Sequence, residues 1–304
     1  MQSVYYRNLG ASQSSYNAAL QCFRNRARSF PISGPVQAND LTDHVLNDHP
    51  EIFYVGPELR ATSFLMKTSV FPTYLYSPEE TAKLKKQLDA TADEIIASLI
   101  NDHQSDYDKV RAFHDYLKST VEYAFETLGR DVARSLSDME TQTVIGALLR
   151  HRCVCAGIAS AFKFLCDRIG LECWSVQGLG NGTLYSGRHR WNIVRINGYY
   201  HHVDVTWDLQ YADSASTPNY GYLNLSDEEI GRDHTWDRKN YPECPSSPYN
   251  YFRVNNALMD CRAQLETFLY NSFQMEEEFI MFRVVRGSPL EREINGCLSD
   301  SIQR

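Results

Sequence analysis

Residues 155–170 read CAGIASAFKFLCDRIG, and this stretch decides the fold that the sequence predicts. Large apolar residues recur here at i, i+4, i+7 and i+11, which is the spacing of one helix face: Ile158, Phe162, Leu165 and Ile169. Gly170 follows the last of them and is typical of a helix C-terminus. We therefore predict a helix that begins with Cys155 and packs against a core.

The position of Cys155 at the start of this helix suggests a catalytic role. Unsatisfied backbone N–H groups and the positive end of the helix dipole stabilise a thiolate there. A small, buried cysteine is the structural alternative, and this feature alone does not exclude it. Cys153, Cys166 and Cys173 lie nearby in sequence, but no CxxC pair occurs among them. We therefore expect no metal ion and no cofactor.

The segment after this helix predicts an antiparallel sheet. Strand-like runs occupy 171–178, 189–196 and 199–207, and Asn197-Gly198 separates the last two as a two-residue turn. With that turn, the numbers of paired residues sum to 395, so that His189 lies opposite Thr206 and Trp191 lies opposite Asp204. All four side chains then share one face of the sheet.

On that face His189 and Asp204 become diagonal neighbours, about 7 to 8 Å apart at the backbone. A carboxylate at this distance can fix the imidazole tautomer and leave the other ring nitrogen free to face a thiolate. Cys155, His189 and Asp204 would then form an activated-thiol triad. A one-residue bulge would reverse the parity of the strand, and His202 would become the nearest rival imidazole.

Three blocks of this sequence resemble the transglutaminase-like superfamily, and specifically bacterial proteins related to papain-fold thiol enzymes. The blocks are GALLRHRCVCAGIASAFKFLCDRIGLEC at 146–173, HRWNIVRINGYYHHVDVTWD at 189–208 and YLNLSDEEIGRDHTW at 222–236. The resemblance implies an α+β, papain-like core with the nucleophile helix packed on an antiparallel sheet.

The same resemblance implies that Cys155 is the nucleophile, His189 the general base and acid, and Asp204 the orienting carboxylate. Cys153 fits no catalytic position of the pattern and is interpreted as structural. The sequence departs from the pattern at Ile158, where a tyrosine is common, and at Arg190, where a small residue is common. A bulky Arg190 at the cleft would alter the choice of substrate.

The rest of the chain suggests three regions. Residues 1–105 are expected to be mostly helical, 106–248 to form the catalytic core, and 249–304 to form a small α+β unit. Helices are predicted at 77–100, after a Ser-Pro-Glu-Glu start, and at 106–123. His114 lies beside the apolar stripe of the second helix, and we interpret it as structural.

Composition excludes several classes of partner. Asp and Glu outnumber Lys and Arg by 38 to 30, and the net charge of −8 offers no field that attracts nucleic acid. The apolar runs fall well short of the roughly 18 residues that cross a membrane, and the first 30 residues contain no signal-peptide core. A cytoplasmic location and secretion after signal removal both stay open.

The predicted activity is thiol-dependent acyl transfer on peptide or glutamine-type amides through a thioester. Hydrolysis, as in a protease or amidase, is favoured over cross-linking by an amine, and the expected partner is a peptide or protein substrate. A non-enzymatic binding module that keeps the fold is the alternative from another class. Trp191 and Trp207 are predicted to wall the substrate cleft.

Overall fold

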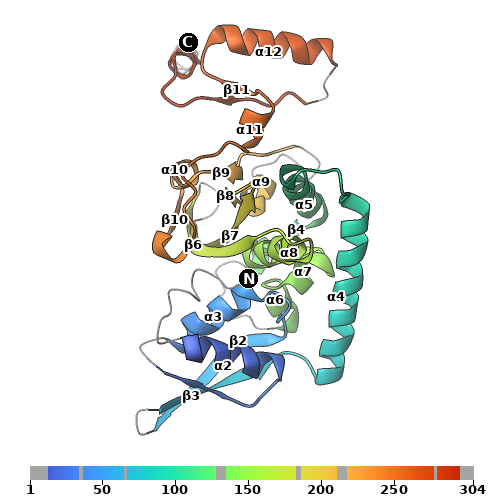
Figure 1. Cartoon of the computed structure of the whole chain (residues 1–304), viewed down its shortest axis with the longest axis vertical. Helices are drawn as coiled ribbons and strands as arrows, with labels where there is room; N and C mark the ends of the chain where they lie inside the picture. Colours follow the sequence, from blue (N-terminus) through green and yellow to red (C-terminus); the bar gives the residue numbers. More distant parts are fainter. Residues whose placement is uncertain are drawn as a thin grey trace. The chain divides into compact units, whose positions relative to one another are not determined.

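The structure is a computed structural model of the chain, and it describes residues 13–33, 37–64, 67–127, 135–182, 186–210, 218–276 and 279–294. Helices and mainly antiparallel strands alternate along it, which makes the fold α+β (Figure 1). The chain divides into two compact units, Met1–Ser246 and Ser247–Arg304. The predicted boundary near residue 105, inside the first unit, stays a prediction.

The centre of the first unit is a five-stranded sheet in the order β10-β6-β7-β8-β9. Its strands are paired antiparallel throughout: β6 (Cys173–Asn181), β7 (Ser186–Ile196), β8 (Tyr199–Val203), β9 (Leu223–Leu225) and β10 (His234–Trp236). In the β7–β8 hairpin Asn192 pairs with Val203 and Ile196 with Tyr199, which is the predicted register. Asn197 and Gly198 both have positive φ, as a two-residue hairpin turn of this type requires.

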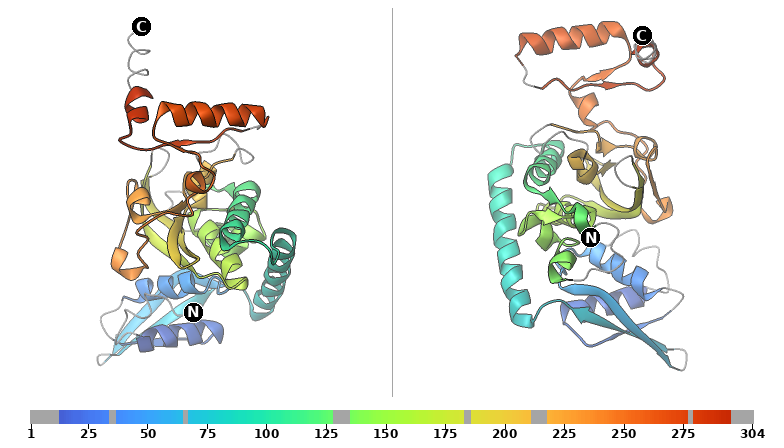
Figure 2. Two further views of the ribbon diagram at one scale, coloured as in Figure 1. Left: turned by 45° about the horizontal axis from the view of Figure 1, so that its top comes forward. Right: turned by 180° about the vertical axis from the view of Figure 1, so that it is seen from behind.

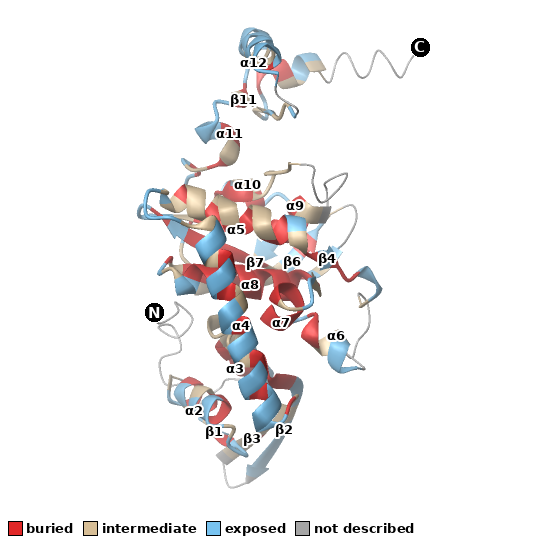
Figure 3. Ribbon diagram, turned by 90° about the vertical axis from the view of Figure 1, so that its right-hand side faces the viewer, coloured by how far each residue is buried: buried red, intermediate tan, exposed pale blue. Residues whose placement is uncertain are grey.

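The helix predicted from 155–170 is α8 (Cys155–Arg168), and it packs against β6 and β7. Its first twelve residues are all buried, and Figure 3 shows the helix almost entirely in red. The side chain of Asn192 on β7 donates hydrogen bonds to the carbonyls of Ala159 and Trp174, at 3.0 and 3.2 Å. These bonds join the helix to the sheet. Gly170 takes a φ of +78°, which ends the helix.

One part of the predicted hairpin is wrong, because the strand expected to reach Trp207 stops at Val203. Residues Val205–Gln210 form the short helix α9 instead. Oδ1 of Asp204 accepts a hydrogen bond from the backbone N–H of Trp207, at 3.2 Å, which is how an aspartate caps a helix start. Thr206 therefore lies in a helix and does not pair across the sheet with His189.

The N-terminal region is less helical than predicted. It contains α2 (Gln13–Arg24) and α3 (Ala38–Asp48), but also a three-stranded antiparallel sheet in the order β1-β3-β2. Its strands are β1 (Phe30–Ile32), β2 (Val55–Phe64) and β3 (Lys67–Tyr74), which Figure 2 shows beside the two helices. Much of β2 is exposed, so its sequence lacks the apolar alternation that announces a half-buried strand.

The helices predicted at 77–100 and 106–123 are present as α4 (Pro78–Leu99) and α5 (Asp106–Thr120), the second of which ends three residues earlier than predicted. Ser77 and Glu80 cap α4 reciprocally, and the Ser105 side chain caps α5. Short elements complete the first unit: β4 (Glu122–Tyr123), η2 (Phe125–Thr127), α6 (Leu136–Glu140), α7 (Val144–Leu148), β5 (Arg152–Cys153), α10 (Asp227–Ile230) and η3 (Arg238–Asn240). Strands β4 and β5 pair in parallel just before α8.

The second unit contains α11 (Tyr251–Val254), β11 (Leu258–Met259), α12 (Arg262–Gln274) and β12 (Arg283–Val284). The run YNYFRV at 249–254 is typical of a strand, but Asn250 caps a helical turn there by accepting the N–H of Phe252. The apolar pattern at 257–273 is typical of a helix; α12 begins only at Arg262, because Leu258 and Met259 pair with β12. No helix in the described part of the chain is long and apolar enough to cross a membrane.

Candidate active site

Cys155 is the first residue of α8, and the backbone before it is tightly held. Val154 is extended and donates its N–H to the carbonyl of Thr141 at 3.0 Å. Gly157 faces the same segment so closely that a Cβ there would lie 2.6 Å from the Thr141 carbonyl oxygen and 2.6 Å from Cβ of Cys153. Only glycine lets the first turn of α8 approach so near. The sulfur is thereby held at the helix start, with Cys155 8% exposed.

Two opposing effects act on the Cys155 thiol. Burial raises its pKa, but a hydrogen bond and a positive charge from His189 lower it, and the backbone and side chain of Arg190 lower it further. The net pKa lies below the usual value. A buried cysteine without such partners behaves in the opposite way: burial raises the pKa of Cys153 far above its normal range.

His189 projects from β7 at a position opposite Gly178 of β6. It is 4% exposed, and its Nε2 lies 2.6 Å from Oδ2 of Asp204. Nδ1 has no partner of strict hydrogen-bond geometry among the described residues, which leaves this nitrogen for the thiol. Burial lowers the pKa of His189, but the charge and hydrogen bond of Asp204 and the interaction with Cys155 raise it to about 10. The ring is therefore an imidazolium at neutral pH.

Asp204 sits where β8 gives way to α9. It is 1% exposed, yet its pKa lies well below the usual range, because the His189 charge and hydrogen bonds from His189 and His234 outweigh the burial that would raise it. The structure thus brings together the three predicted residues Cys155, His189 and Asp204. The predicted register holds as far as the pair Asn192–Val203, and Asp204 follows directly after it, so the predicted pairs of Trp191 with Asp204 and of His189 with Thr206 do not form.

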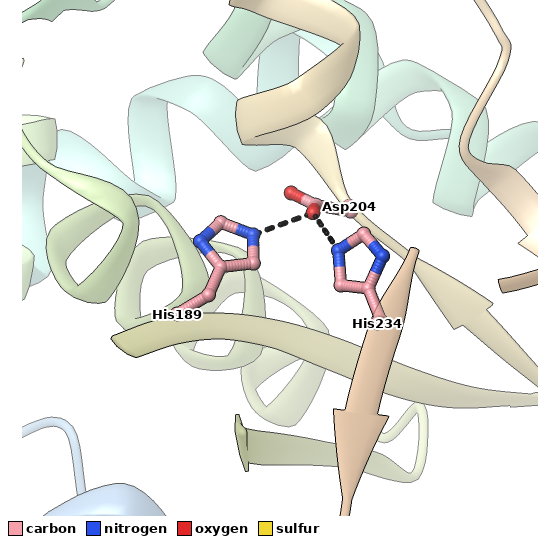
Figure 4. A group of neighbouring side chains, drawn as sticks. All are labelled: His189, Asp204 and His234. Atoms are coloured by element: carbon pink, nitrogen blue, oxygen red, sulfur yellow. Dashed lines mark hydrogen bonds and ion pairs between the residues drawn. The ribbon is translucent and has the colours of Figure 1, made fainter. Parts of the chain in front are cut away.

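His234 is the residue of this site that the sequence did not reveal. It lies on β10, and its Nε2 is 3.0 Å from the same Oδ2 of Asp204 that His189 contacts. Figure 4 shows the two imidazoles approaching this carboxylate from β7 and β10. His234 belongs to one of the quoted blocks, but nothing local indicates that β10 pairs with β6, 54 positions earlier at Gly180.

Trp191 and Trp207 surround the histidines. The Trp191 ring stacks on His189 with centroids 5.8 Å apart, and the Trp207 ring lies 5.7 Å from His189 and 4.2 Å from His234. The tryptophans are only 1% and 2% exposed, respectively. Their role as walls of a substrate cleft stays a prediction. Their burial fits packing that excludes water from the His189–Asp204 pair, since a dry site strengthens that interaction.

His202 is not a rival for Asp204. Its Nδ1 accepts the indole N–H of Trp191 at 2.9 Å, and its Nε2 lies 2.8 Å from Oδ1 of Asp227. Burial lowers its pKa, so the ring is neutral and donates to Asp227. His114 is also structural, as expected, because both of its nitrogens are engaged, by Asp115 and by Asp208 of α9.

Among the residues that the structure describes, two groups of side chains have donor atoms placed so that they could hold a metal ion. They are His189, Asp204 and His234, and His202, Asp227 and Cys244, with the donor atoms of each group within 4.8 Å of one another. In the first group the nitrogens and the carboxylate oxygen are already joined by hydrogen bonds of 2.6 and 3.0 Å. Hydrogen bonding explains that arrangement, and the expected absence of a metal stays a prediction.

Arg190, which the sequence singled out, lines a cavity of about 540 Å³ beside α8. Residues of α3 and of the segment from 50 to 58 form one wall, and residues 139–144 with Ser160 form another. Arg188 also lines this space, while the carboxylates of Asp43 and Glu58 lie on exposed parts of it. Arg190 thus lines this cavity and also lowers the pKa of Cys155.

Parts of the chain are similar to known proteins. Residues 93–205 match the model of the transglutaminase-like superfamily. The chain is 26% identical to kyphoscoliosis peptidase of Homo sapiens over 181 residues, which are 55% of this chain and 25% of that protein. For kyphoscoliosis peptidase of Mus musculus the identity is 27% over 181 residues, covering 52% and 26%. This chain therefore matches only about a quarter of the length of these relatives.

Among solved structures, the chain is similar to a crystal structure of a TGase, with 11% identity and a TM-score of 0.36 over 85% of this chain and 71% of that one. The family match covers the helix that carries Cys155, the strand that carries His189 and the turn that carries Asp204. Residues 93–205 of this chain are therefore similar to the transglutaminase-like superfamily over the part that contains all three residues.

Proposed function

We propose that this protein is a thiol enzyme that cleaves peptide or glutamine-type amides, with Cys155, His189 and Asp204 as its triad. One observation carries the proposal. A cysteine at a helix start and a buried imidazole each shift the other's pKa toward the ionised form, and a carboxylate lies 2.6 Å from the imidazole on its other side. This is the arrangement that activates a thiol for acyl transfer.

The reaction follows from the charges of these groups. The Cys155 thiolate attacks the carbonyl carbon and forms a C–S bond, while His189 gives its proton to the leaving nitrogen as the C–N bond breaks. A thioester remains. Water then attacks that thioester and neutral His189 takes a proton from the water. The C–S bond breaks, which releases the acid and restores the Cys155 thiolate beside the His189 imidazolium. Asp204 keeps the ring oriented and stabilises its positive form throughout.

Hydrolysis is favoured over cross-linking. The curated relatives are named peptidases, although this chain matches only about a quarter of their length. Cross-linking differs in the last step alone, where a primary amine replaces water as the group that attacks the thioester. The substrate is accordingly proposed to be a peptide or protein that presents an amide to Cys155.

The proposal is tested by letting water and a primary amine compete for the thioester. The protein is incubated with casein and a fluorescent primary amine, and new N-termini and incorporated fluorescence are counted in the same sample, with Cys155→Ser as the matched inactive control. Hydrolysis that exceeds amine incorporation at modest amine concentration supports the proposal. Amine transfer that dominates would assign the chain to cross-linking.

The near-complete burial of the site favours a second candidate, a binding module that keeps the fold without turnover. Cys155 is 8% and His189 only 4% exposed, so access to the sulfur is narrow. Iodoacetamide labelling distinguishes the two. Fast, pH-dependent alkylation of Cys155 that is lost in His189→Ala supports the enzyme, and labelling no faster than that of an ordinary exposed cysteine supports the binding module.

A further inference from the structure

His234 lies at the end of a chain of buried polar contacts that starts at the nucleophile. It is 1% exposed, and each of its ring nitrogens meets a carboxylate: Nδ1 is 2.6 Å from Oδ1 of Asp233, and Nε2 is 3.0 Å from Oδ2 of Asp204 (Figure 4). An ionised carboxylate can only accept hydrogen bonds. Both nitrogens must therefore donate, and the ring carries two protons and a positive charge.

This ring restrains Asp204. Oδ2 of that carboxylate accepts from His189 and from His234, and Oδ1 accepts the backbone N–H of Trp207. Donors thus approach the carboxylate from β7, from β10 and from the start of α9. Any rotation of the carboxylate that moves Oδ2 away from His189 breaks the bond to His234 as well. Without His234, only the Trp207 backbone would oppose that rotation from outside the triad.

We propose that His234 is a positioning residue, whose Nε2–H holds Oδ2 of Asp204 in line with Nε2 of His189. The inference rests on the proposed triad and adds a fourth member that acts through Asp204. Asp233 in turn orients the His234 ring, and the hydroxyl of Tyr222 donates to the other oxygen of Asp233 at 2.7 Å. A series of hydrogen bonds from Tyr222 through Asp233 and His234 therefore supports the Asp204 carboxylate.

Other charged and titratable groups near His234 define what a pH measurement would report. Asp204 and Asp233 contact it directly, the His189 ring lies 5.3 Å away and the Tyr222 ring 5.7 Å away. His202 lies within electrostatic range. The charge on His234 opposes the charge on His189, so removing it acts on His189 independently of the hydrogen bond. A test must separate these two effects.

A pair of variants separates them. His234→Gln loses the positive charge but keeps an amide N–H that can donate to Asp204, whereas His234→Phe loses both the charge and the donor. The pseudo-first-order rate of iodoacetamide alkylation of Cys155 is measured from pH 4 to 9 in the whole chain, with the Cys155 peptide quantified by mass spectrometry.

We expect the Phe variant to react about tenfold more slowly than the Gln variant at neutral pH, the smaller end of the loss seen when a supporting partner is removed. Its pH midpoint should lie above that of the Gln variant, because a poorly held Asp204 stabilises the His189 imidazolium less. Coincident profiles of the two variants would overturn the inference. A packing role alone would not separate their midpoints.

Two further measurements keep the result unambiguous. His201→Phe makes the same change at a buried histidine of β8 that is not among the groups bonded to Asp204, and it should leave the profile unchanged. If circular dichroism shows that His234→Phe is unfolded, His234→Met replaces it, since methionine matches glutamine in length and lacks the donor.

Failure of the proposed enzyme function and failure of the His234 inference give different results. An unreactive Cys155 in the wild-type protein would contradict the thiol enzyme itself. The pKa of His189, followed by NMR of its ring, still tests the positioning role in that case. It should be lower in the Phe variant than in the Gln variant, and equal values would overturn the inference.

Discussion

At the scale of single residues, the charge state of the site rests on one buried ion pair. Burial opposes the charge on Cys155 and on His189. His189 nevertheless lowers the pKa of Cys155, and Cys155 raises the pKa of His189, so that the ionised form of each is favoured. The pair is possible because Asp204 supplies a fixed negative charge behind the ring. A thiolate and an imidazolium are therefore stable together in a place from which water is nearly excluded.

This pair predicts the pH range over which the site is reactive. The pKa of Cys155 lies below its ordinary value of 9.0, and the pKa of His189 is raised to about 10. Turnover should rise with pH as the thiol ionises, below pH 9, and fall as His189 loses its proton near pH 10. A full pH profile of amide cleavage measures both limits. A rise centred at or above pH 9 would contradict the ion pair.

Replacing Asp204 by Asn tests the orienting group. The amide keeps the size of the side chain but turns an N–H toward the imidazole or offers a weaker acceptor, so that the ring is held in the wrong tautomer. We expect turnover to fall by roughly 10⁴, as in the serine-protease case from which that figure comes. The measurement is kcat of purified, folded variant. A loss smaller than tenfold would show that another group orients His189.

At the scale of elements, the approach of α8 to the segment before it decides where the sulfur lies. Gly157 packs against the carbonyls of Thr141 and Thr143 and against Cys153, at distances that leave no room for a methyl group. The neighbours are mainly backbone atoms and cannot rotate away. The start of α8 is therefore set by contact with residues 141–143 and not by helix propensity.

Gly157→Ala should consequently displace the first turn of α8. Alanine favours helices intrinsically, so propensity alone predicts stabilisation, whereas overpacking predicts a loss of roughly 1–3 kcal/mol. We expect the loss, together with slower alkylation of Cys155, because the sulfur moves relative to His189. Chemical denaturation and iodoacetamide kinetics on one preparation check both. Increased stability with unchanged alkylation would mean that the contact relaxes at no cost.

At the scale of the whole molecule, a second buried ion pair joins α5 to α9, the short helix between β8 and β9. His114 of α5 is fully buried, with Nε2 2.9 Å from Oδ2 of Asp208 on α9. Burial lowers the pKa of His114, but hydrogen bonds and charge from Asp115 and Asp208 raise it to about 9, above its ordinary value of 6.5. The folded chain thus holds this proton more tightly than the unfolded chain does.

This tighter proton binding stabilises the folded chain at low pH, and the stabilisation disappears at high pH. Below pH 6.5 both states carry the proton and the full contribution to the free energy of unfolding is present, on the order of 3 kcal/mol. That contribution is lost as the pH rises through about 9. The difference in stability between the wild type and His114→Gln should therefore shrink from pH 6.5 to 9, as measured by urea denaturation. A difference that grows with pH would show that His114 is buried neutral.

Much of the site was predictable because its signals are local. The spacing of Ile158 and its partners defines α8, and Asn197-Gly198 defines the hairpin and its register. Together they align His189 with the residues near Asp204 on one face. Strand β8 was predicted four residues too long. The alternation of apolar residues carries no signal for a helix that an aspartate side chain caps immediately after a strand.

The sequence by itself therefore determined the nucleophile helix, the hairpin and the face that carries the histidine, since periodicity and turn chemistry act between residues close in the chain. Only the tertiary structure decided that β10 pairs with β6, that His234 thereby meets Asp204, and that Trp191 and Trp207 are buried around the imidazoles. It also decided that residues 30–74 contain a sheet. These features arise from pairing between distant strands, whose partners are selected by the packing of the complete core.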